Sequence, residues 1–252
     1  MNDELLVEIA ENANTYTPLG SADERIATDR YVLWMGRGNE PHWNAAQRFR
    51  LEAGEVEEVR AELHELLRAR GRTGLTWEVG THATPGDLTE RLLALGLIDD
   101  EPSPHVVGMV LTEPLAAAPP DVEVRRPETT EERLAAETIA AIAFGEPMPT
   151  EPPPPRDDRN GAVYLAFVDG KPVARASAAF GEHAVSLFGG ATLPEARGQG
   201  AYRALVAARW ADAVARGTPV LVTQASPMSR PILARLGFRE VCEIHILLDK
   251  LA

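Results

Sequence analysis

The sequence has few of the residues that mark several large classes of protein. Its single cysteine, Cys242, excludes an internal disulfide and a zinc site built from several thiolates. Lysine occurs only at Lys171 and Lys250, and the Gly-x-x-x-x-Gly-Lys motif of a nucleotide-binding phosphate loop is missing. The histidines never stand three to five residues apart, so the sequence predicts no metal site.

Long apolar runs and an excess of positive charge are also missing. No segment approaches the roughly 18 apolar residues that cross a bilayer, and the N-terminus lacks the basic start of a signal peptide. We therefore expect a cytoplasmic protein that does not enter a membrane. The formal net charge of -13 argues against a nucleic-acid partner and favours a cationic one, such as an amine.

The residues that are present are typical of a globular protein. The chain has 252 residues, of which 44% are hydrophobic and 25% charged, and this length allows one large domain or two modest ones. Prolines and alanines dominate residues 114–121, a composition that ends helices and strands. We expect this segment to be a linker between a domain of residues 1–113 and a domain of residues 122–252.

The second half begins with the pattern of a helix, which is followed by three apolar, β-rich segments. Asp169-Gly170 between the first two of these segments predicts a hairpin turn. Gly189-Gly190 near the end of the third predicts a bulge. The expected helix and strands cover residues 130–144, 162–168, 172–180 and 183–193.

A long helix, a short helix and two more strands complete this half. Apolar residues at helical spacing run from Tyr202 to Val214, with Arg209 expected on the solvent-exposed face. After a buried strand over 219–224, Ser226 followed by proline predicts the start of a second helix. Residues 241–248 alternate in polarity as a final strand. This order of elements predicts an α+β fold.

Residues 194–202, with the sequence PEARGQGAY, join the third strand to the long helix. Gly198 and Gly200 allow several backbone N–H groups to point into one concavity, and a helix N-terminus adds roughly half a positive charge. Arg197 supplies an extra donor. We interpret the segment as a binding loop for a pyrophosphate, although it lacks the third glycine of a dinucleotide-binding fingerprint.

This loop, the elements around it and the later Leu236-Gly237-Phe238 resemble the GNAT superfamily of acyl-CoA-dependent N-acyltransferases. The signature of that family is Arg/Gln-x-x-Gly-x-Gly/Ala. Arg197 and Gly200 match it, whereas Tyr202 departs from it at the last position. The resemblance implies a GNAT-like mixed central sheet flanked by helices. It also implies acetyl-CoA as co-substrate, a small amine as acceptor, and no metal.

The resemblance further implies which groups bind the co-substrate. Main-chain groups of Ala191, Thr192 and Leu193 would pair with the pantetheine arm, and N–H groups of the loop would hold the pyrophosphate. An amine would attack the thioester directly, and a backbone N–H of the bulged strand would polarise the oxyanion. The loop residues are Arg197, Gly198, Gln199, Gly200, Ala201 and Tyr202.

The sequence does not identify the general acid or the general base. The family often has a tyrosine where this sequence has Leu233, and leucine cannot protonate a departing thiolate. A catalytically silent acyl-CoA-binding or scaffolding protein is therefore the alternative function. The substitutes for the acid are Ser226, Ser229 and Cys242, and the candidates for the base are Glu182, His183, Glu243 and His245.

The first half repeats short motifs of the second at nearly the same spacing. Leu92–Leu97 matches Leu233–Phe238, and Gly71 ends a helix pattern as Gly217 does. The first half is therefore expected to be a smaller, degenerate GNAT-like domain, with an unrelated structural domain as the alternative. In place of the phosphate loop it has four carboxylates within residues 52–58, which would repel a pyrophosphate. We expect this half not to bind CoA.

Overall fold

The computed structural model describes residues 2–115, 121–153 and 159–251. The chain divides into two compact units. Unit 1 contains residues 1–110, 224–234 and 239–252, and unit 2 contains residues 111–223 and 235–238. Most of the predicted linker, residues 114–121, lies outside the described residues. Within the described chain, no helix is long and apolar enough to cross a membrane.

Unit 1 has a mixed sheet in the order β1-β2-β3-β4-β12-β6, in which only the β3–β4 pair is parallel. The short strand β5 also pairs with β12. The helices of this unit are α1 (Asp3–Glu11), α2 (Ala13–Tyr16), α3 (Val56–Arg68), α4 (Leu88–Ala94) and α7 (Arg230–Arg235), with a 3-10 turn over Pro41–Trp43. The strands are β1 (Glu24–Ala27), β2 (Val32–Met35), β3 (Asn44–Gln47), β4 (Gly74–Gly80), β5 (Ile98–Asp99), β6 (His105–Leu111) and β12 (Arg239–Lys250).

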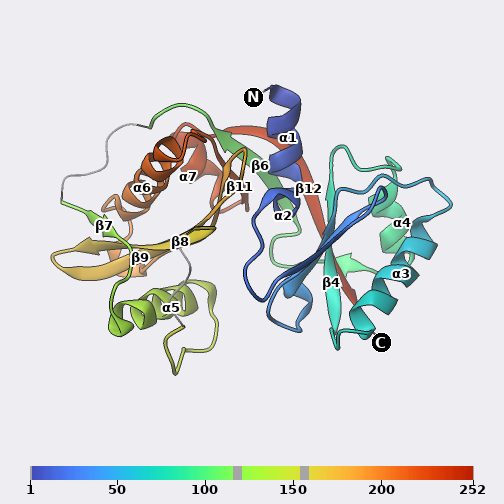
Figure 1. The fold of residues 1–252 in the computed structure, drawn as a ribbon, viewed down its shortest axis with the longest axis horizontal. Coiled ribbons are helices and arrows are strands. Elements are labelled where there is room, and N and C mark those ends of the chain that lie inside the picture. Colours follow the sequence, from blue (N-terminus) through green and yellow to red (C-terminus); the bar gives the residue numbers. More distant parts are fainter. Residues whose placement is uncertain (1, 116–120, 154–158, 252) are drawn as a thin grey trace. The chain divides into compact units, whose positions relative to one another are not determined.

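The core of unit 1 lies between the sheet and the helices α3 and α4 (Figure 1). Trp77 of β4 is fully buried and stacks on Phe49, with 4.8 Å between ring centroids. α3 packs on them with apolar residues at helical spacing, which is why it lies flat on the sheet. Its buried residues are Val56, Val59, Leu63 and Leu67.

The last strand, β12, pairs with strands of the first half of the chain. It runs antiparallel to β4 from Ile244, opposite Gly80, to Lys250, opposite Gly74, and it pairs with β6 on its other edge. Alternation of polarity correctly identified residues 241–248 as a strand, but the sequence placed them with the second half. The ladder instead makes β12 a central strand of unit 1.

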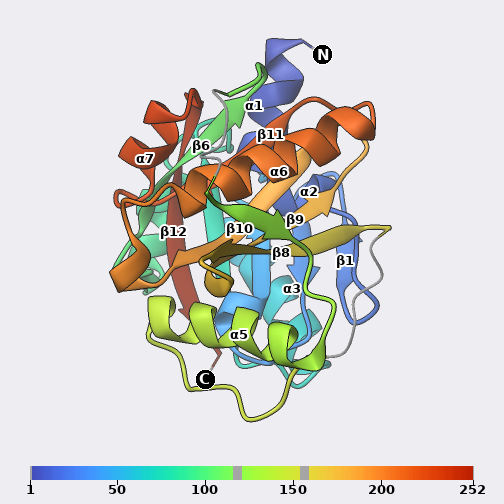
Figure 2. The same ribbon diagram turned by 90° about the vertical axis from the view of Figure 1, so that its left-hand side faces the viewer.

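Unit 2 has the strand order β11-β10-β9-β8-β7, and only the β10–β11 pair is parallel. Helix α5 covers one face of the sheet and α6 the other (Figures 1 and 2). The mixed sheet flanked by helices confirms the predicted α+β class. The elements are β7 (Glu123–Arg125), α5 (Thr130–Phe144), β8 (Gly161–Val168), β9 (Lys171–Phe180), β10 (Val185–Thr192), η2 (Pro194–Ala196), α6 (Ala201–Ala215) and β11 (Leu221–Ala225).

Two predicted details of the helices were wrong. Arg209 of α6 was expected in solvent but is only 1% exposed, whereas Val214 of the expected apolar stripe is 51% exposed. The second correction concerns Ser226, which does not begin a helix. Its carbonyl accepts hydrogen bonds from the N–H groups of Ser229 and Arg230, so a turn precedes α7, which begins at Arg230.

The two units repeat one order of elements. In each, an antiparallel three-strand meander leads into a long helix, and the next strand returns parallel to the third strand of the meander. A short helix follows in the chain. The glycines of the sequence repeat occupy matching positions, because Gly71 and Gly217 have φ of 67° and 76°, and Gly96 and Gly237 have φ of 91° and 98°. The repeat in sequence is therefore also a repeat in topology.

Candidate functional site

The glycine-rich segment of unit 2 forms a loop at the start of α6. Gly198 and Gly200 have φ of 81° and 84°, a left-handed conformation that favours glycine, and Gly200 is the N-cap of the helix. The first helical hydrogen bond runs from Ala204 N–H to the Gly200 carbonyl. The N–H groups of the first turn therefore have no acceptor within the helix, as at any helix N-terminus.

The charge of this loop suits an anion. The 15-residue α6 begins without an acidic residue in its first turn, so its N-terminal partial charge is not offset there. Arg197, just before the glycines, is exposed and lies next to the helix start. Gln199 closes the loop by donating from Nε2 to the Glu195 carbonyl at 3.2 Å. Exposed donors, glycine backbone and a helix N-terminus together can hold a pyrophosphate.

The strand that leads into the loop has a bulge at the predicted glycines. In β10, Phe188 pairs with Ser177 and Ala191 pairs with Arg175, so one extra residue of β10 is inserted between the two pairs. Gly189, within the bulge, has φ of 58°. The bulge redirects the backbone of β10 just before the residues predicted to pair with a pantetheine arm.

Side chains pack against the bulge from two directions. A Cβ atom on Gly189 would lie 2.4 Å from Arg175 Nη1, and one on Gly190 would lie 2.7 Å from the ring of Tyr202. A side chain at either position would therefore have to displace Arg175 or Tyr202 from the bulge. Tyr202, the residue that departs from the family signature, lies against Gly190 of the bulge. Its aromatic ring is half-buried.

Arg209, a residue of α6, is a buried cation. Arg209 donates from Nε to the Leu205 carbonyl at 3.0 Å and from Nη1 to the Ser177 carbonyl at 3.3 Å. Its Nη2 is buried and has no acceptor in the described part of the chain. Burial lowers the pKa of Arg209, and the nearby hydroxyls of Tyr202 and Tyr164 act against that shift. This residue was missed because the helical pattern placed it in solvent.

The strands β10 and β11 stay paired over only a short length. Their parallel ladder comprises Val185 opposite Leu221 and Ser186 opposite Val222, although β10 continues to Thr192. The predicted binding residues Ala191, Thr192 and Leu193 lie beyond this ladder, with Ala191 buried and the other two half-buried. The structure thus brings them, the bulge and the glycine loop together along one stretch of unit 2.

The corresponding segment of unit 1 carries carboxylates at the start of α3. Glu55 accepts a hydrogen bond from the N–H of Glu52 at 2.7 Å, and Glu57 and Glu58 stand in the first turn of α3. Arg30 contacts Glu58 at 2.9 Å. The first turn of α3 therefore carries acidic side chains that offset the positive end of its dipole, whereas the first turn of α6 has none.

No family model matches the sequence, and no curated protein matches it. Among solved structures, a GCN5-related N-acetyltransferase from Kribbella flavida is similar with a TM-score of 0.75 and 20% identity, over 97% of this chain and 95% of that one. A tandem GNAT protein from the clavulanic acid biosynthesis pathway is similar with a TM-score of 0.58 and 14% identity, over 99% and 95% of the two chains. The chain has the GNAT fold.

A third neighbour has the same fold. It is an acetyltransferase from the GNAT family from Novosphingobium aromaticivorans, with a TM-score of 0.57, 19% identity and coverage of 90% of this chain and 92% of that one. In the GNAT fold of unit 2, the glycine loop stands between the third strand of the meander and the long helix, as the sequence motif predicted. The resemblance stated from Arg197 and Gly200 is therefore confirmed for the fold.

The candidate catalytic residues are spread over both units. Glu182 and His183 are exposed in the turn between β9 and β10 of unit 2. Glu243 is exposed on β12 of unit 1, where His245 contacts Asp99 at 2.7 Å. Within unit 1 and within unit 2, these candidates therefore lie on different elements from the glycine loop.

The candidates for the acid lie around α7. Ser226 and Ser229 have their hydroxyl oxygens 3.4 Å apart in the turn before that helix, and Leu233 within it is 1% exposed. Cys242 is buried, and burial together with the charge of Glu11 raises the pKa of its thiol to about 12. A thiol with that pKa is a core group and not a nucleophile at neutral pH.

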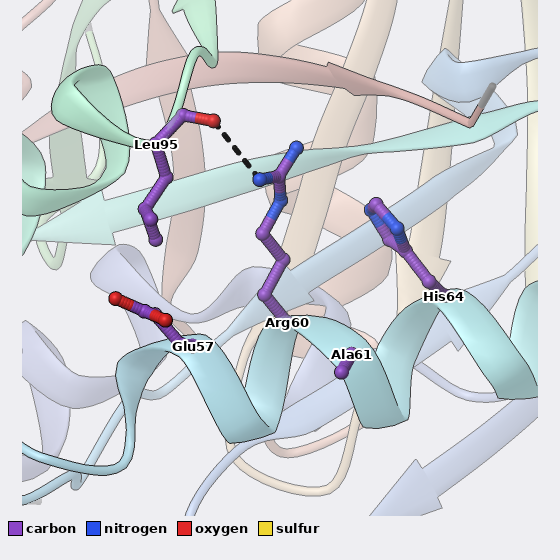
Figure 3. A pocket seen from close by; sticks show the side chains of 5 residues that line it. All are labelled: Glu57, Arg60, Ala61, His64 and Leu95. Atoms are coloured by element: carbon purple, nitrogen blue, oxygen red, sulfur yellow. Dashed lines mark hydrogen bonds between the residues drawn. The ribbon is translucent and has the colours of Figure 1, made fainter.

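Unit 1 contains a cavity of about 370 Å³ beside α3 (Figure 3). Its basic side chains already have partners, because Arg60 donates to Asp249 at 2.8 Å and to the Leu95 carbonyl at 2.9 Å. His64 contacts the same aspartate at 2.8 Å. These contacts join β12 to α3, so the cavity wall has a structural role. The lining residues are Glu57, Arg60, Ala61, His64 and Leu95.

Glu78 of β4 is a buried carboxyl that the sequence analysis missed. Gln47 and Gln224 donate to its Oε2 at 3.0 and 3.3 Å, and burial raises its pKa to about 7. A carboxyl that titrates near neutrality is of the kind used in acid–base catalysis. Nothing in the pattern of β4 distinguishes it, because the shift depends on residues that are distant in the chain.

The raised pKa of Glu78 predicts an unusual pH dependence of stability. Between pH 4.5 and about 7, Glu78 keeps its proton in the folded protein but has lost it in the unfolded chain. The contribution of Glu78 to the free energy of unfolding therefore decreases as pH rises through this range. Glu78→Gln should remove that loss, making the variant more stable than the wild type at pH 8 by up to about 3 kcal/mol. Urea unfolding of both proteins at pH 5 and pH 8 tests this, and equal pH dependence in the two proteins would contradict it.

Proposed function

We propose that this protein is an N-acetyltransferase that transfers the acetyl group of acetyl-CoA to a small amine, and that unit 2 binds the co-substrate. The observation that carries the proposal is the loop with Gly198 and Gly200 at positive φ, directly before the 15-residue α6 and after a bulged strand. This arrangement supplies backbone donors for a pyrophosphate, with Arg197 beside them. The N–H groups of residues 197–202 would hold the pyrophosphate.

The proposed reaction needs no covalent enzyme intermediate. The amine nitrogen forms a bond to the acetyl carbon while the carbon–sulfur bond breaks, and the nitrogen loses a proton while the thiolate of CoA gains one. The bulged part of β10 would stabilise the oxyanion through a backbone N–H. The net charge of -13 favours a cationic acceptor, because it attracts protonated amines to the protein.

Turnover and binding together test this function. We expect calorimetry to show saturable binding of about one acetyl-CoA per chain, and a thiol-release assay with a panel of amines to show turnover with at least one of them. The full chain is used because β12 provides the ladder partner of β4 in unit 1. Absence of acetyl-CoA binding would contradict the proposal.

A catalytically silent acyl-CoA-binding protein is the second candidate, and one observation favours it. Leu233 stands where the family often has its tyrosine, and it is 1% exposed, so this position offers no acid to the departing thiolate. Binding of acetyl-CoA without thiol release from any amine in the panel would support this alternative.

We propose that unit 1 is a degenerate copy of the same domain that does not bind CoA. The repeated topology and the matching positive-φ glycines, Gly71 with Gly217 and Gly96 with Gly237, support the duplication. The carboxylates of Glu55, Glu57 and Glu58 at the start of α3 would repel a pyrophosphate, which supports the absence of CoA binding in this copy. The first copy takes β12 as one of its strands. A stoichiometry of two acetyl-CoA per chain would contradict this assignment.

A further inference from the structure

Arg175 of β9 lies against the bulge of β10. It is 6% exposed, and its Nη1 donates to the carbonyl oxygen of Gly189 at 2.9 Å. Its Nη2 lies 3.5 Å from Glu137 Oε1 of α5, which places a carboxylate behind the guanidinium. Burial of an arginine against a main-chain carbonyl costs free energy, since the charge must be taken out of water. Its position at the bulge therefore indicates a role in function.

The direction of the backbone in β10 can be read from its hydrogen bonds. Val185 N–H donates to the Val220 carbonyl, and the Leu187 carbonyl accepts from Thr223 Oγ1, so these two residues face β11. Leu193 N–H donates instead to Val173, so this odd-numbered residue faces β9. Because successive residues of a strand point to opposite edges, the bulge must reverse the alternation between 187 and 193.

After this reversal the even-numbered residues face the edge toward β11. Counting back from Leu193 by this alternation assigns Thr192 and Gly190 to that edge, and both lie beyond the two-residue ladder that joins β10 to β11. Gly190 N–H belongs to the same peptide group as the Gly189 carbonyl. In a trans peptide the N–H and C=O point in opposite directions, so the Gly190 N–H points away from Arg175.

We propose that Arg175 is a positioning residue that polarises the Gly189–Gly190 peptide, so that the Gly190 N–H becomes the donor to the thioester carbonyl oxygen. The inference rests on the proposed acetyltransferase function. A hydrogen bond from a cation to a peptide carbonyl draws electron density from the amide nitrogen and strengthens its N–H as a donor. Preorganised donors of this kind stabilise the negative charge that develops on the oxygen during acyl transfer.

The local sequence is adapted to this contact. Gly189 has φ of 58°, and a Cβ there would lie 2.4 Å from Arg175 Nη1, so only glycine permits the arginine to reach the carbonyl. Tyr202 lies against Gly190 and restrains the same peptide from the side of α6. The peptide is thereby held between Arg175 and Tyr202. An arginine with only a packing role would need no such access to the carbonyl.

The first test uses the protein without co-substrate. Arg175→Met should shift the amide nitrogen and proton resonances of Gly190 upfield in a nuclear magnetic resonance spectrum, because the peptide loses its polarising partner. Arg175→Lys should restore part of the shift, since lysine keeps the charge but not the planar geometry. Arg125→Met, which removes an arginine from a different carboxylate pair of unit 2, serves as the control and should leave Gly190 unchanged.

The second test measures the bound co-substrate directly. In infrared difference spectra with carbon-13-labelled acetyl-CoA, the thioester carbonyl stretch should lie lower in the wild type than in Arg175→Met. The affinity for acetyl-CoA should be unchanged and kcat should fall about tenfold, less than on complete loss of an oxyanion donor. Glu137→Gln keeps the arginine but removes the carboxylate paired with it, so it should give an intermediate frequency. This variant replaces Arg175→Met in the comparison if Arg175→Met does not fold.

The outcomes separate this inference from the proposed function. If the wild type binds acetyl-CoA and all proteins show the same carbonyl frequency and the same Gly190 resonances, the role of Arg175 is wrong and the function stands. If the wild type does not bind acetyl-CoA, the proposed function fails and the inference fails with it. A thioester carbonyl frequency that is lower in the wild type than in Arg175→Met, and intermediate in Arg175→Lys, supports both the proposed function and the role of Arg175.

Discussion

Replacing Gly200 by valine is expected to abolish measurable acetyl-CoA binding, with a loss of at least about 100-fold in affinity. Gly200 has φ of 84° at the N-cap of α6, and a β-branched residue is strongly disfavoured there. Relief of the strain must move the backbone and misdirect the N–H groups of the loop. Loss of two charge-assisted hydrogen bonds of about 1.5–3 kcal/mol each corresponds to this change in affinity.

The chain offers a matched control for this variant at the other end of the same helix. Gly217 has φ of 76°, and no atom lies within 4 Å of the position where its Cβ would stand. Gly217→Val therefore introduces similar backbone strain away from the loop, and it should keep its affinity for acetyl-CoA. Calorimetric titration of both variants is the measurement. Normal affinity of Gly200→Val would contradict the assignment of the loop, whereas loss in both variants would indicate general destabilisation.

Replacing Asp249 by alanine is expected to lower the free energy of unfolding by about 3–5 kcal/mol, as when one partner of a buried ion pair is removed. The carboxylate is 2% exposed and accepts hydrogen bonds from Arg60, His64 and the indole of Trp77. Burial acts to raise the pKa of Asp249, but the hydrogen bonds from Arg60 and His64 outweigh burial and hold its pKa below the usual value.

The expected loss of stability arises because Asp249 connects a strand of unit 1 to a helix of unit 1. Asp249 lies on β12, whereas Arg60 and His64 lie on α3, so the substitution leaves two donors of the helix without their acceptor. Urea unfolding at pH 7 is the measurement. Glu240→Ala, which removes the partner of the exposed Arg230 on the same unit, is the control and should change the midpoint little. Equal effects of the two substitutions would contradict the structural role of Asp249.

Local signals in the sequence were sufficient where neighbouring residues decide the structure. The predicted helix over 130–144 has the observed bounds of α5, because Thr129 and Glu132 form a capping box at its start and Gly145 takes a left-handed conformation after its end. The bulge at Gly189-Gly190 and the loop before α6 are also local, since they depend on glycine backbone conformations. These features led from the sequence to the GNAT fold.

Features that depend on distant residues could not be predicted in this way. The alternation in residues 241–248 identifies a strand, but nothing in it specifies β4 and β6 as its partners. Arg209 was placed in solvent because helical spacing cannot show that a guanidinium will find the Ser177 carbonyl of another strand. Burial of Glu78 between Gln47 and Gln224 is likewise a property of three separate segments.

The sequence by itself determined the class of fold, the position of the glycine loop before α6 and the presence of a repeat, because turn glycines, caps and polarity patterns act over a few residues. Only the tertiary structure decided that β12 belongs to unit 1, that Asp249 joins it to α3, and that Arg175 reaches the Gly189 carbonyl. Those contacts join residues far apart in the chain, and they form because burial of a charged group requires a partner that the fold alone can bring within reach.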